Sequence, residues 1–444
     1  AEAAELLQSG ILCILGEGPA QYYPRYAAPD YARLLQNGSA FLELKPAGDL
    51  LEATASLLTA YKYFPCEALP VFIGRLDELL EPYIDSLPEE MARKVLRSFW
   101  LLVDRLNPSG FVHADLGPAE SKAGRMLLEV DRELKTITNL TLRYDPQTTP
   151  RAFALQAVGN ALEVTKPYFL NHPAMLKDWG EDYVIASCYN AMRLRGGIYT
   201  LVRLNLKRAA EYAGNDPERF LDETLPRIGK LWAEIIESRS RYIIEDVRWF
   251  EDNFWVNEGY LRQDKFSAYA GVFALAEAAN HFTQANGKTE ARYGWDEGAN
   301  ALAARITGRI HEVLEANPIP ACEGTGGRAC FHAQVGITSD LGTTPAVRVP
   351  SGQEPELYQH ILTEAPTHRW ITGGVSTILE FDQTAAANPA AVLDIIDGAH
   401  RSGIRNLSIG SANSEFVRVT GYLVRRADLE AYQAEKALRH SSAA

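Results

Sequence analysis

A glycine interrupts a strand-like run of residues near the end of the chain. The run is Phe416-Val417-Arg418-Val419-Thr420-Gly421-Tyr422-Leu423-Val424. Glycine weakens the interior of a strand, so a glycine there indicates a bulge or the close approach of another backbone or a ligand. A second interpretation is chemical. The flanking amide groups stabilise a radical on a glycine Cα, and the carbon becomes planar because no side chain resists.

A cysteine segment in the middle of the chain supplies a partner for such a radical. Residues 181–190 read Glu-Asp-Tyr-Val-Ile-Ala-Ser-Cys-Tyr-Asn and place Cys188 near the end of an apolar run. A stored carbon radical needs a thiol that it can convert into a reactive thiyl radical. Taken alone, Cys188 fits a buried structural thiol, which is the usual fate of a free cysteine. Together with Gly421 it favours the thiyl interpretation.

Three segments resemble the motifs of glycyl radical enzymes. Residues 418–422 are similar to the Arg-Val-x-Gly-Tyr signature of that superfamily, and residues 181–190 to the active-site cysteine segment of the pyruvate formate-lyase type. Upstream, residues 139–144 are similar to an Asn-x-Thr strand that precedes the cysteine segment. Residues 196–206 and 336–348 resemble the YjjI-type glycine radical family most closely. The resemblance covers most of the chain, from about residue 107 to residue 424. It does not identify a substrate.

The resemblance implies a fold and a division of roles. The fold is of the α/β class, a ten-stranded α/β barrel made of two half-barrels, in which the glycine loop and the cysteine loop meet. Gly421 stores the radical, Cys188 carries the thiyl, and Arg418 and Tyr422 support the radical loop. A separate S-adenosylmethionine-dependent activase installs the radical, and no cofactor is bound permanently. We expect the Cys188 sulfur within about 5 Å of the Gly421 Cα, because direct hydrogen transfer needs proximity.

The residues beside Cys188 separate the subclasses of this superfamily. Pyruvate formate-lyase has two adjacent cysteines, whereas here Ser187 takes the first position. Serine is a poor acyl carrier, so ordinary pyruvate cleavage is disfavoured. Dehydratases and decarboxylases place a glutamate two residues after the cysteine. Here that residue is Asn190, which cannot act as a general base, and we assign it to substrate binding instead.

Other residues must then supply acid–base and binding groups. His113 titrates near neutrality, and Asp115 lies two residues away, on the same side of a strand. We consider both as catalytic candidates, with a structural histidine as the alternative. The loop from Cys322 to Cys330 is rich in glycine and carries Glu323. It is either a surface loop or a substrate lid with a dithiol.

Arg348 is a further substrate-binding candidate. It follows a strand-like run, and a guanidinium group holds a carboxylate or phosphate well. A surface or structural ion pair is an equal alternative for Arg348. For His332, near Cys330, substrate binding and a structural role are likewise both open.

The composition and net charge indicate a globular protein and restrict its possible partners. The 444 residues are 46% hydrophobic and 23% charged, which is ordinary for a globular protein, and the net charge is −13. That charge disfavours nucleic acid and anionic membranes as partners. No apolar run reaches the ~18 residues of a membrane span, and no signal peptide is recognisable at the start. The chain begins at Ala1, so whether this N-terminus is native does not follow.

The five cysteines are sparse and irregularly spaced, which is typical of a reducing cytoplasm rather than of a disulfide framework. No Cys-x-x-Cys pair is present, so we expect no metal site. The expected partners are therefore an activase and a small-molecule substrate, and a homodimer is left open.

The order of predicted elements favours three regions. Residues 1–106 read as mostly helical, residues 107–400 as the barrel core with the thiyl loop, and residues 401–444 as the glycyl radical segment. Strands are predicted at 138–144, 183–187, 346–349, 405–409 and 417–424. Helices are predicted at 50–61, 73–84, 88–100, 151–164, 199–212, 228–242, 265–285, 295–315 and 389–402. Alternation of strands and helices after residue 111 favours an α/β core.

The sequence therefore favours a glycyl radical enzyme of the lyase or transferase type. An anaerobic ribonucleotide reductase-like reaction, with Cys322 and Cys330 as reductant, is one alternative. The chain has no cysteine after Cys330, so the zinc site of those reductases is absent. A non-catalytic scaffold or spare glycyl domain is the other alternative, although spare domains are short and lack a counterpart of Cys188. The substrate and the number of subunits do not follow from the sequence.

Overall fold

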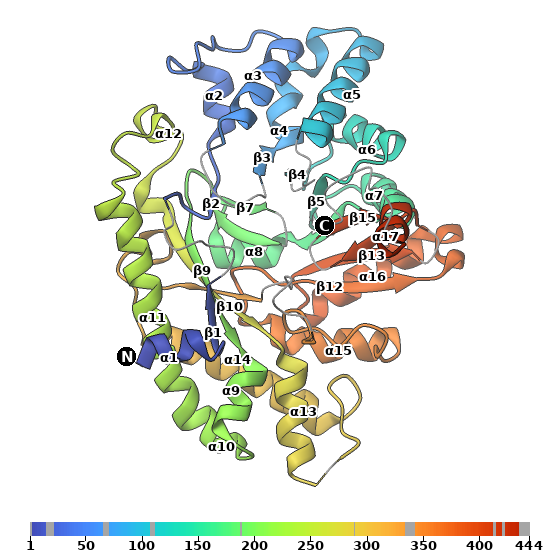
Figure 1. Cartoon of the computed structure of the whole chain (residues 1–444). Coiled ribbons are helices and arrows are strands. Elements are labelled where there is room, and N and C mark those ends of the chain that lie inside the picture. Colours follow the sequence, from blue (N-terminus) through green and yellow to red (C-terminus); the bar gives the residue numbers. More distant parts are fainter. Residues whose placement is uncertain are drawn as a thin grey trace.

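The computed structural model describes residues 2–14, 22–64, 71–106, 112–186, 189–287, 289–333, 342–411, 414–419 and 422–434. Two β-sheets lie in the middle of the molecule, with helices around them (Figure 1). The α/β fold that the sequence predicts is confirmed. Ten-stranded closure stays a prediction, because the described strands form one sheet of five and one of six.

The six-stranded sheet has the order β12-β13-β6-β5-β4-β3. Its strands are β3 (Val71–Arg75), β4 (Val112–Leu116), β5 (Asn139–Tyr144), β6 (Tyr168–Asn171), β12 (Thr377–Phe381) and β13 (Asn406–Ser411). Strands β3 to β6 are parallel, and β13 runs antiparallel to β6. The crossover helices are α5 (Glu89–Leu106), α6 (Lys122–Leu134) and α7 (Arg151–Val164), and α16 (Pro389–Ser402) packs beside α7. Crossover helices are what parallel neighbours require.

The five-stranded sheet contains β1 (Leu12–Ile14), β2 (Tyr26–Ala27), β9 (Gly197–Asn205), β10 (Phe266–Phe273) and β11 (Cys330–Ala333). Strands β9, β10 and β11 are parallel, and β1 and β2 pair antiparallel with β9. Outward side chains of these strands pack with α11 (Leu225–Arg241), α13 (Leu275–Ala285) and α14 (Glu297–Ala316). Every residue of β9 and β10 is buried.

Two hairpins complete the arrangement. The first, which we call the finger hairpin, consists of β7 (Tyr183–Ala186) and β8 (Asn190–Arg193). Strand β7 contacts β3 and β4, while β8 contacts β9 and β10, so the finger hairpin lies between the two sheets (Figure 1). The second, the C-terminal hairpin, pairs β14 (Phe416–Val419) with β15 (Tyr422–Arg425). The single strand predicted at 417–424 is therefore two strands.

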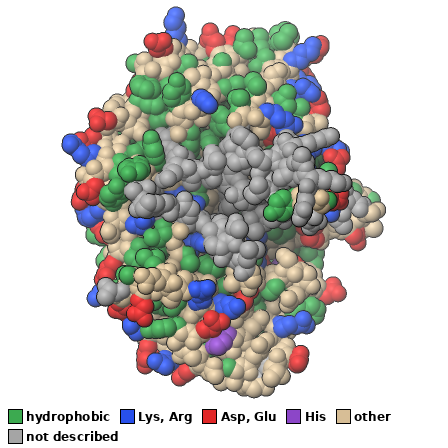
Figure 2. All heavy atoms as spheres, viewed as in Figure 1, with side chains coloured by type: hydrophobic (Ala, Val, Ile, Leu, Met, Phe, Trp, Pro, Cys, Tyr) green, Lys and Arg blue, Asp and Glu red, His purple; other side chains and the backbone are tan. Residues whose placement is uncertain are grey.

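The remaining helices are α1 (Glu2–Gln8), α2 (Tyr31–Asn37), α3 (Leu50–Lys62), α4 (Leu76–Leu80), α8 (His172–Trp179), α9 (Leu206–Ala213), α10 (Pro217–Arg219), α12 (Phe254–Asn257), α15 (Leu357–His368) and α17 (Arg426–Gln433). In the part of the chain that the structure describes, no helix combines the length and the apolar composition that a bilayer crossing requires. On the face in Figure 2, acidic and basic side chains are interspersed around a centre that is not described.

Several predicted elements differ from the structure. The helices predicted at 199–212 and 265–285 each begin with a strand, β9 and β10. The helix predicted at 73–84 begins inside β3, and no strand forms at 346–349. The mostly helical region 1–106 also supplies β1, β2 and β3 to the two sheets. Fully buried strands carry continuous apolar runs, which cannot be told from helices by spacing alone.

Candidate active site

The six-stranded sheet holds the finger hairpin through its backbone. The Ile185 N–H donates a hydrogen bond to Oδ2 of Asp115, 3.0 Å away. At the base of the hairpin, the Arg75 guanidinium donates to the carbonyl oxygens of Glu181 and Tyr183, at 2.5 and 2.6 Å. Arg75 ends β3, so the hairpin enters at the carboxyl end of the parallel strands. Strand β7 therefore lies along the inner face of the sheet.

The five-stranded sheet holds the other strand of the finger hairpin. The Tyr269 hydroxyl donates to the carbonyl oxygen of Ala191 at 2.7 Å, and the Arg193 side chain donates to the carbonyl oxygen of Gly324 at 2.6 Å. The Ala191 N–H donates to Gly373 at 2.9 Å. Bonds from both sheets therefore fix the hairpin in position.

Ser187 and Cys188, at the tip of the finger hairpin, lie outside the described residues. The next residue, Tyr189, is 1% exposed and has a φ of +69°, which bulky residues rarely adopt. Its hydroxyl is hydrogen-bonded to that of Ser408, and its ring centroid lies 5.3 Å from that of Tyr168. The immediate neighbour of Cys188 is thus buried on the inner faces of β6 and β13.

His113 and Asp115 lie on the inner face of β4, as strand alternation predicts, and both are fully buried. Nε2 of His113 lies 2.8 Å from the Thr141 hydroxyl oxygen and 3.5 Å from Oδ1 of Asp115. The other carboxylate oxygen of Asp115 holds Ile185. The structure therefore brings both candidates beside the finger hairpin, and it gives Asp115 a positioning contact.

The proposed binding residues are spread more widely. Asn190 begins β8 and is fully buried beside the tip. Arg348 donates to the backbone oxygen of Ser376 at 3.0 Å and to its hydroxyl at 2.6 Å. It lines a pocket of about 640 Å³ beside β12, with Glu380 on the same wall. Glu323 is exposed on a short turn.

Cys322 and Cys330 are both buried and approach the same serine. The Ser267 hydroxyl lies 3.6 Å from the Cys330 sulfur and also bonds the Cys322 thiol. Burial raises the pKa of Cys330 to about 11 and the pKa of Cys322 further still. Thiol–disulfide exchange proceeds through the thiolate, so these thiols are poorly suited to it at neutral pH.

Sequence reasoning did not single out Tyr168, Tyr189 or Ser408, which surround the tip of the finger hairpin. One signal was available, because polar Asn406 and Ser408 alternate with apolar neighbours along β13. Such alternation marks a polar inner face.

The C-terminal hairpin docks at the opposite end of the same sheet. Phe416 and Leu423 form a small apolar cluster with Ile137 and Val164, which precede β5 and β6. Polar contacts surround this cluster. The Arg425 guanidinium donates to the Lys135 carbonyl oxygen at 2.5 Å, and the Lys135 ammonium pairs with Glu415 at 2.5 Å.

Thr420 and Gly421, between the two strands of the C-terminal hairpin, lie outside the described residues, as do the side chains of Arg418 and Tyr422. Strand β14 ends at Val419 and β15 begins at Tyr422, and these two residues pair. The finger hairpin thus enters at the carboxyl end of the parallel strands, and the C-terminal hairpin docks at their amino end.

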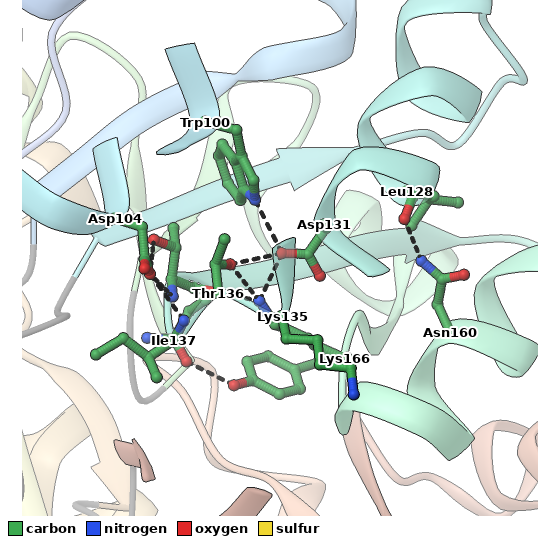
Figure 3. Close-up of polar contacts among 12 residues, drawn as sticks. Trp100, Asp104, Leu128, Asp131, Lys135, Thr136, Ile137, Asn160 and Lys166 are labelled. Carbon is green, nitrogen blue, oxygen red and sulfur yellow. Dashed lines mark hydrogen bonds and ion pairs between the residues drawn. The ribbon is translucent and has the colours of Figure 1, made fainter. Parts of the chain in front are cut away.

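A buried polar network supports the docking platform, residues 135–137 (Figure 3). The Lys166 ammonium pairs with Asp131 at 2.6 Å and donates to Thr136 at 2.6 Å. Asp104 accepts the Ile137 N–H at 2.7 Å. Lone buried charges are costly, and here each charge has partners, so the network holds residues 135–137 in position beneath the hairpin.

Three comparisons place these features among known proteins. The model of the family described as glycyl radical enzyme YjjI-like matches residues 1–444. A protein of Escherichia coli (strain K12) called "Uncharacterized protein YjjI" is 40% identical over 438 residues, which cover 98% of this chain and 84% of that protein.

Two solved structures share the fold. An anaerobic ribonucleotide reductase matches with a TM-score of 0.77 at 12% identity, over 98% of this chain and 80% of that chain. A glycyl radical enzyme from Archaeoglobus fulgidus matches with a TM-score of 0.67 at 14% identity, over 86% of this chain and 66% of that chain. At these identities the likeness concerns the fold alone.

Proposed function

The chain belongs to the YjjI-like glycyl radical enzyme family, and on that premise we propose that Gly421 stores a radical which Cys188 uses to act on a small organic substrate. One observation carries the proposal most directly. The two hairpins that contain or flank these residues are anchored at opposite ends of the parallel strands of one sheet. That arrangement suits two chain segments that must meet between the sheets.

The proposed reaction has three steps. The Gly421 radical takes the hydrogen atom from the Cys188 thiol, which leaves glycine with its ordinary CH₂ group and cysteine with a thiyl. The thiyl then takes a hydrogen atom from a substrate carbon. After the substrate radical rearranges or fragments, the product radical recovers that hydrogen from Cys188. Enclosure between the sheets keeps water and other quenchers away from the intermediates.

The neighbours of Cys188 narrow the reaction. Ser187 replaces the acyl-carrying cysteine of pyruvate formate-lyase, and Asn190 replaces the glutamate of the dehydratases and decarboxylases. We therefore propose a lyase or transferase type of reaction that uses neither acyl transfer to cysteine nor glutamate-assisted dehydration. His113, beside Thr141 and Asp115, is the proposed acid–base group.

The ribonucleotide reductase-like alternative is less favoured. It needs Cys322 and Cys330 as reductant, yet both thiols are buried and have raised pKa values. A spare-domain function is also disfavoured, because this chain retains the finger hairpin and both sheets.

Glycyl radical enzymes normally require a radical activase. For this chain we propose an S-adenosylmethionine-dependent activase as partner, acting in the cytoplasm. The C-terminal hairpin must leave its platform for the activase to reach residue 421, and local opening of a terminal element is physically accessible.

The test is spectroscopic and needs no substrate. Anaerobic incubation with activase, reductant and S-adenosylmethionine should give an electron-spin doublet, split by the one hydrogen left on the Gly421 Cα. Thiol hydrogens exchange with water, so hydrogen transfer between Cys188 and Gly421 in D₂O should replace that hydrogen and collapse the doublet. Cys188→Ala should keep the doublet and prevent the collapse.

Air supplies a second readout, because oxygen adds to the Cα radical and cuts the backbone at Gly421. Gly421→Ala should abolish both the doublet and the cut. A chain that shows the doublet and then survives air at full length would place the radical on another residue.

A further inference from the structure

Three residues on neighbouring strands of the five-stranded sheet form a row on the face that points toward the other sheet. Gly271 of β10 lies in register with Arg203 of β9 on one side and with His332 of β11 on the other. The residues before them in their strands, Val202, Ala270 and Phe331, belong to the outer apolar core. Successive side chains of a strand point to opposite faces, so the row faces the space between the sheets.

His332 is held rigidly in this row. Its side chain is fully buried, and its ring stacks on Tyr269 with the centroids 4.7 Å apart and the planes 23° apart. The Tyr269 hydroxyl in turn donates to Ala191 of the finger hairpin. The imidazole orientation is therefore coupled to the hairpin that carries Cys188.

Neither ring nitrogen of His332 has a hydrogen-bond partner among the described residues. Burying an imidazole without hydrogen bonds costs free energy, and buried polar groups in folded proteins are paired in the great majority of cases. An exception of this kind, inside the enclosed space that the proposed reaction uses, points to a group that arrives with a ligand.

The ring also lies close to the tip of the finger hairpin. His332 forms a β-bridge with Gly374. A Cβ added to Gly374 would lie 2.2 Å from the carbonyl oxygen of Tyr189 and 3.1 Å from Cδ2 of His332. Only a glycine lets the imidazole edge and the residue after Cys188 come together here.

The charge state of His332 defines what it can bind. Burial, and then the Arg25 and Arg203 cations, lower the pKa of His332 to about 3. The ring is therefore neutral at physiological pH, with one nitrogen that donates and one that accepts. A hydroxyl or carbonyl oxygen matches such a group.

We propose that His332 contacts the substrate, by a hydrogen bond to a hydroxyl or carbonyl oxygen on or next to the carbon that gives its hydrogen to Cys188. This inference rests on the proposed function and deepens it, since it makes the substrate a small oxygenated molecule. A hydrogen bond accepted from such a hydroxyl raises the electron density at the adjacent carbon and favours hydrogen abstraction there.

The test uses the unactivated full-length chain with ¹⁵N-labelled histidines and glycerol as the probe. The His332 ring signals are assigned by their loss in His332→Phe, which keeps an aromatic ring against Tyr269. Glycerol should shift at least one of these signals, and His332→Phe should weaken glycerol binding at least tenfold. His332→Gln, which still donates and accepts, should bind within about threefold of the wild type.

The half-buried His400 on α16 is the matched control, because its Nε2 already bonds the Phe169 carbonyl oxygen at 3.2 Å. Its signals should stay in place. A His332 signal that does not move at molar glycerol, or equal glycerol binding by His332→Phe, would overturn the inference. Activation of the wild type is a separate experiment that tests the proposed radical function through the doublet. Glycerol binding tests the His332 contact, so a missing doublet would contradict the proposed function and leave the glycerol result unchanged.

Discussion

The finger hairpin and the C-terminal hairpin lie at opposite ends of the same parallel strands and are held in different ways. Both sheets bond the finger hairpin, through the side chains of Asp115 and Arg75 on one side and the Tyr269 hydroxyl on the other. Among the described residues, the C-terminal hairpin is held by one small apolar cluster around Phe416, the hydrogen bond from Arg425 to the Lys135 carbonyl oxygen and a peripheral ion pair.

The difference assigns a mechanical role to each hairpin. The free energy of local opening follows the number of buried contacts that must break. The finger hairpin, with polar anchors from both sheets, should open only when the whole chain unfolds. The C-terminal hairpin should open on its own and at lower cost. On the proposed function, the finger hairpin would hold the thiol in position, and opening of the C-terminal hairpin would give the activase access to residue 421.

Removal of the Asp115 anchor should have the largest effect. Asp115→Ala deletes the acceptor of the Ile185 N–H, so the tip of the finger hairpin loses its position. Misplacement of about 1 Å lowers a proximity-dependent rate by about 10²-fold. We expect the D₂O-dependent collapse of the doublet to slow by about that factor while the doublet itself still forms.

Asp115→Asn is the matched control, because an amide oxygen can still accept the Ile185 N–H. It should slow the collapse much less than Asp115→Ala. Equal loss in the two variants would identify the charge of Asp115, rather than its hydrogen bond, as the important property.

Phe416→Ala should loosen the C-terminal hairpin alone. Loss of a buried phenylalanine costs about 3 kcal/mol, which corresponds to an opening on the order of 10²-fold more frequent. Amide hydrogen exchange at 416–419 and 422–425 should accelerate by that factor, while exchange at 183–186 stays unchanged.

Phe169→Ala, in the main core, is the contrasting variant. It should lower the unfolding temperature of the whole chain and leave the difference between the two hairpins in place. If Phe416→Ala accelerates exchange in the finger hairpin as well, the two hairpins are coupled and the comparison fails.

Acid should weaken the base of the finger hairpin through His172. Nδ1 of His172 bonds the Tyr183 hydroxyl at 2.5 Å, and burial, followed by the Arg143 cation, lowers the pKa of His172 to about 4. A depressed folded-state pKa gives stability that is fully present above the unfolded value of about 6.5 and is lost as the pH falls toward 4.

The unfolding free energy should therefore fall over this window more steeply in the wild type than in His172→Gln. Denaturant titrations at pH 7.0 and 4.5 measure the difference between the two chains, which removes the contribution of the other buried histidines. Parallel pH profiles would show that His172 does not anchor the finger hairpin.

The smallest expected effect concerns the ion pair between Lys135 and Glu415. Both side chains are more than one-third exposed, and exposed pairs contribute about 0.2–1 kcal/mol and are screened by salt. Lys135→Gln should speed amide exchange in the C-terminal hairpin by less than about fivefold. Addition of 1 M salt should do the same to the wild type and nothing further to the variant.

The sequence predicted the fold class and some elements well. Helices α7 and α16 begin and end at the predicted residues, because Pro150 precedes the first and Pro389 opens the second. Strands β9 and β10 were predicted as helices, since buried strands lack polar alternation. The segment 346–349 has a β-branched composition, but the N–H of Val349 donates to the buried Glu364 side chain instead of to a neighbouring strand.

In the candidate site, too, some residues can be predicted from local sequence, whereas contacts between distant residues cannot. The roles of Cys188 and Gly421 are predicted from local motifs, because radical storage and thiyl chemistry need particular residue types, and they stay predictions. The anchors of the finger hairpin join Ile185 to Asp115 across 70 positions of sequence, and no local pattern encodes such a pairing. That neither ring nitrogen of His332 has a hydrogen-bond partner among the described residues is likewise a property of the packed interior.

The separation of the small cluster around Phe416 from the two main cores has a consequence for protein quality control. Proteases and chaperones recognise exposed apolar surface, and among the described residues the cluster that a cut near the C-terminus would disturb consists of Ile137, Val164, Phe416 and Leu423. On the proposed function, a chain that oxygen has cut at Gly421 would therefore keep the two main cores that stabilise its fold.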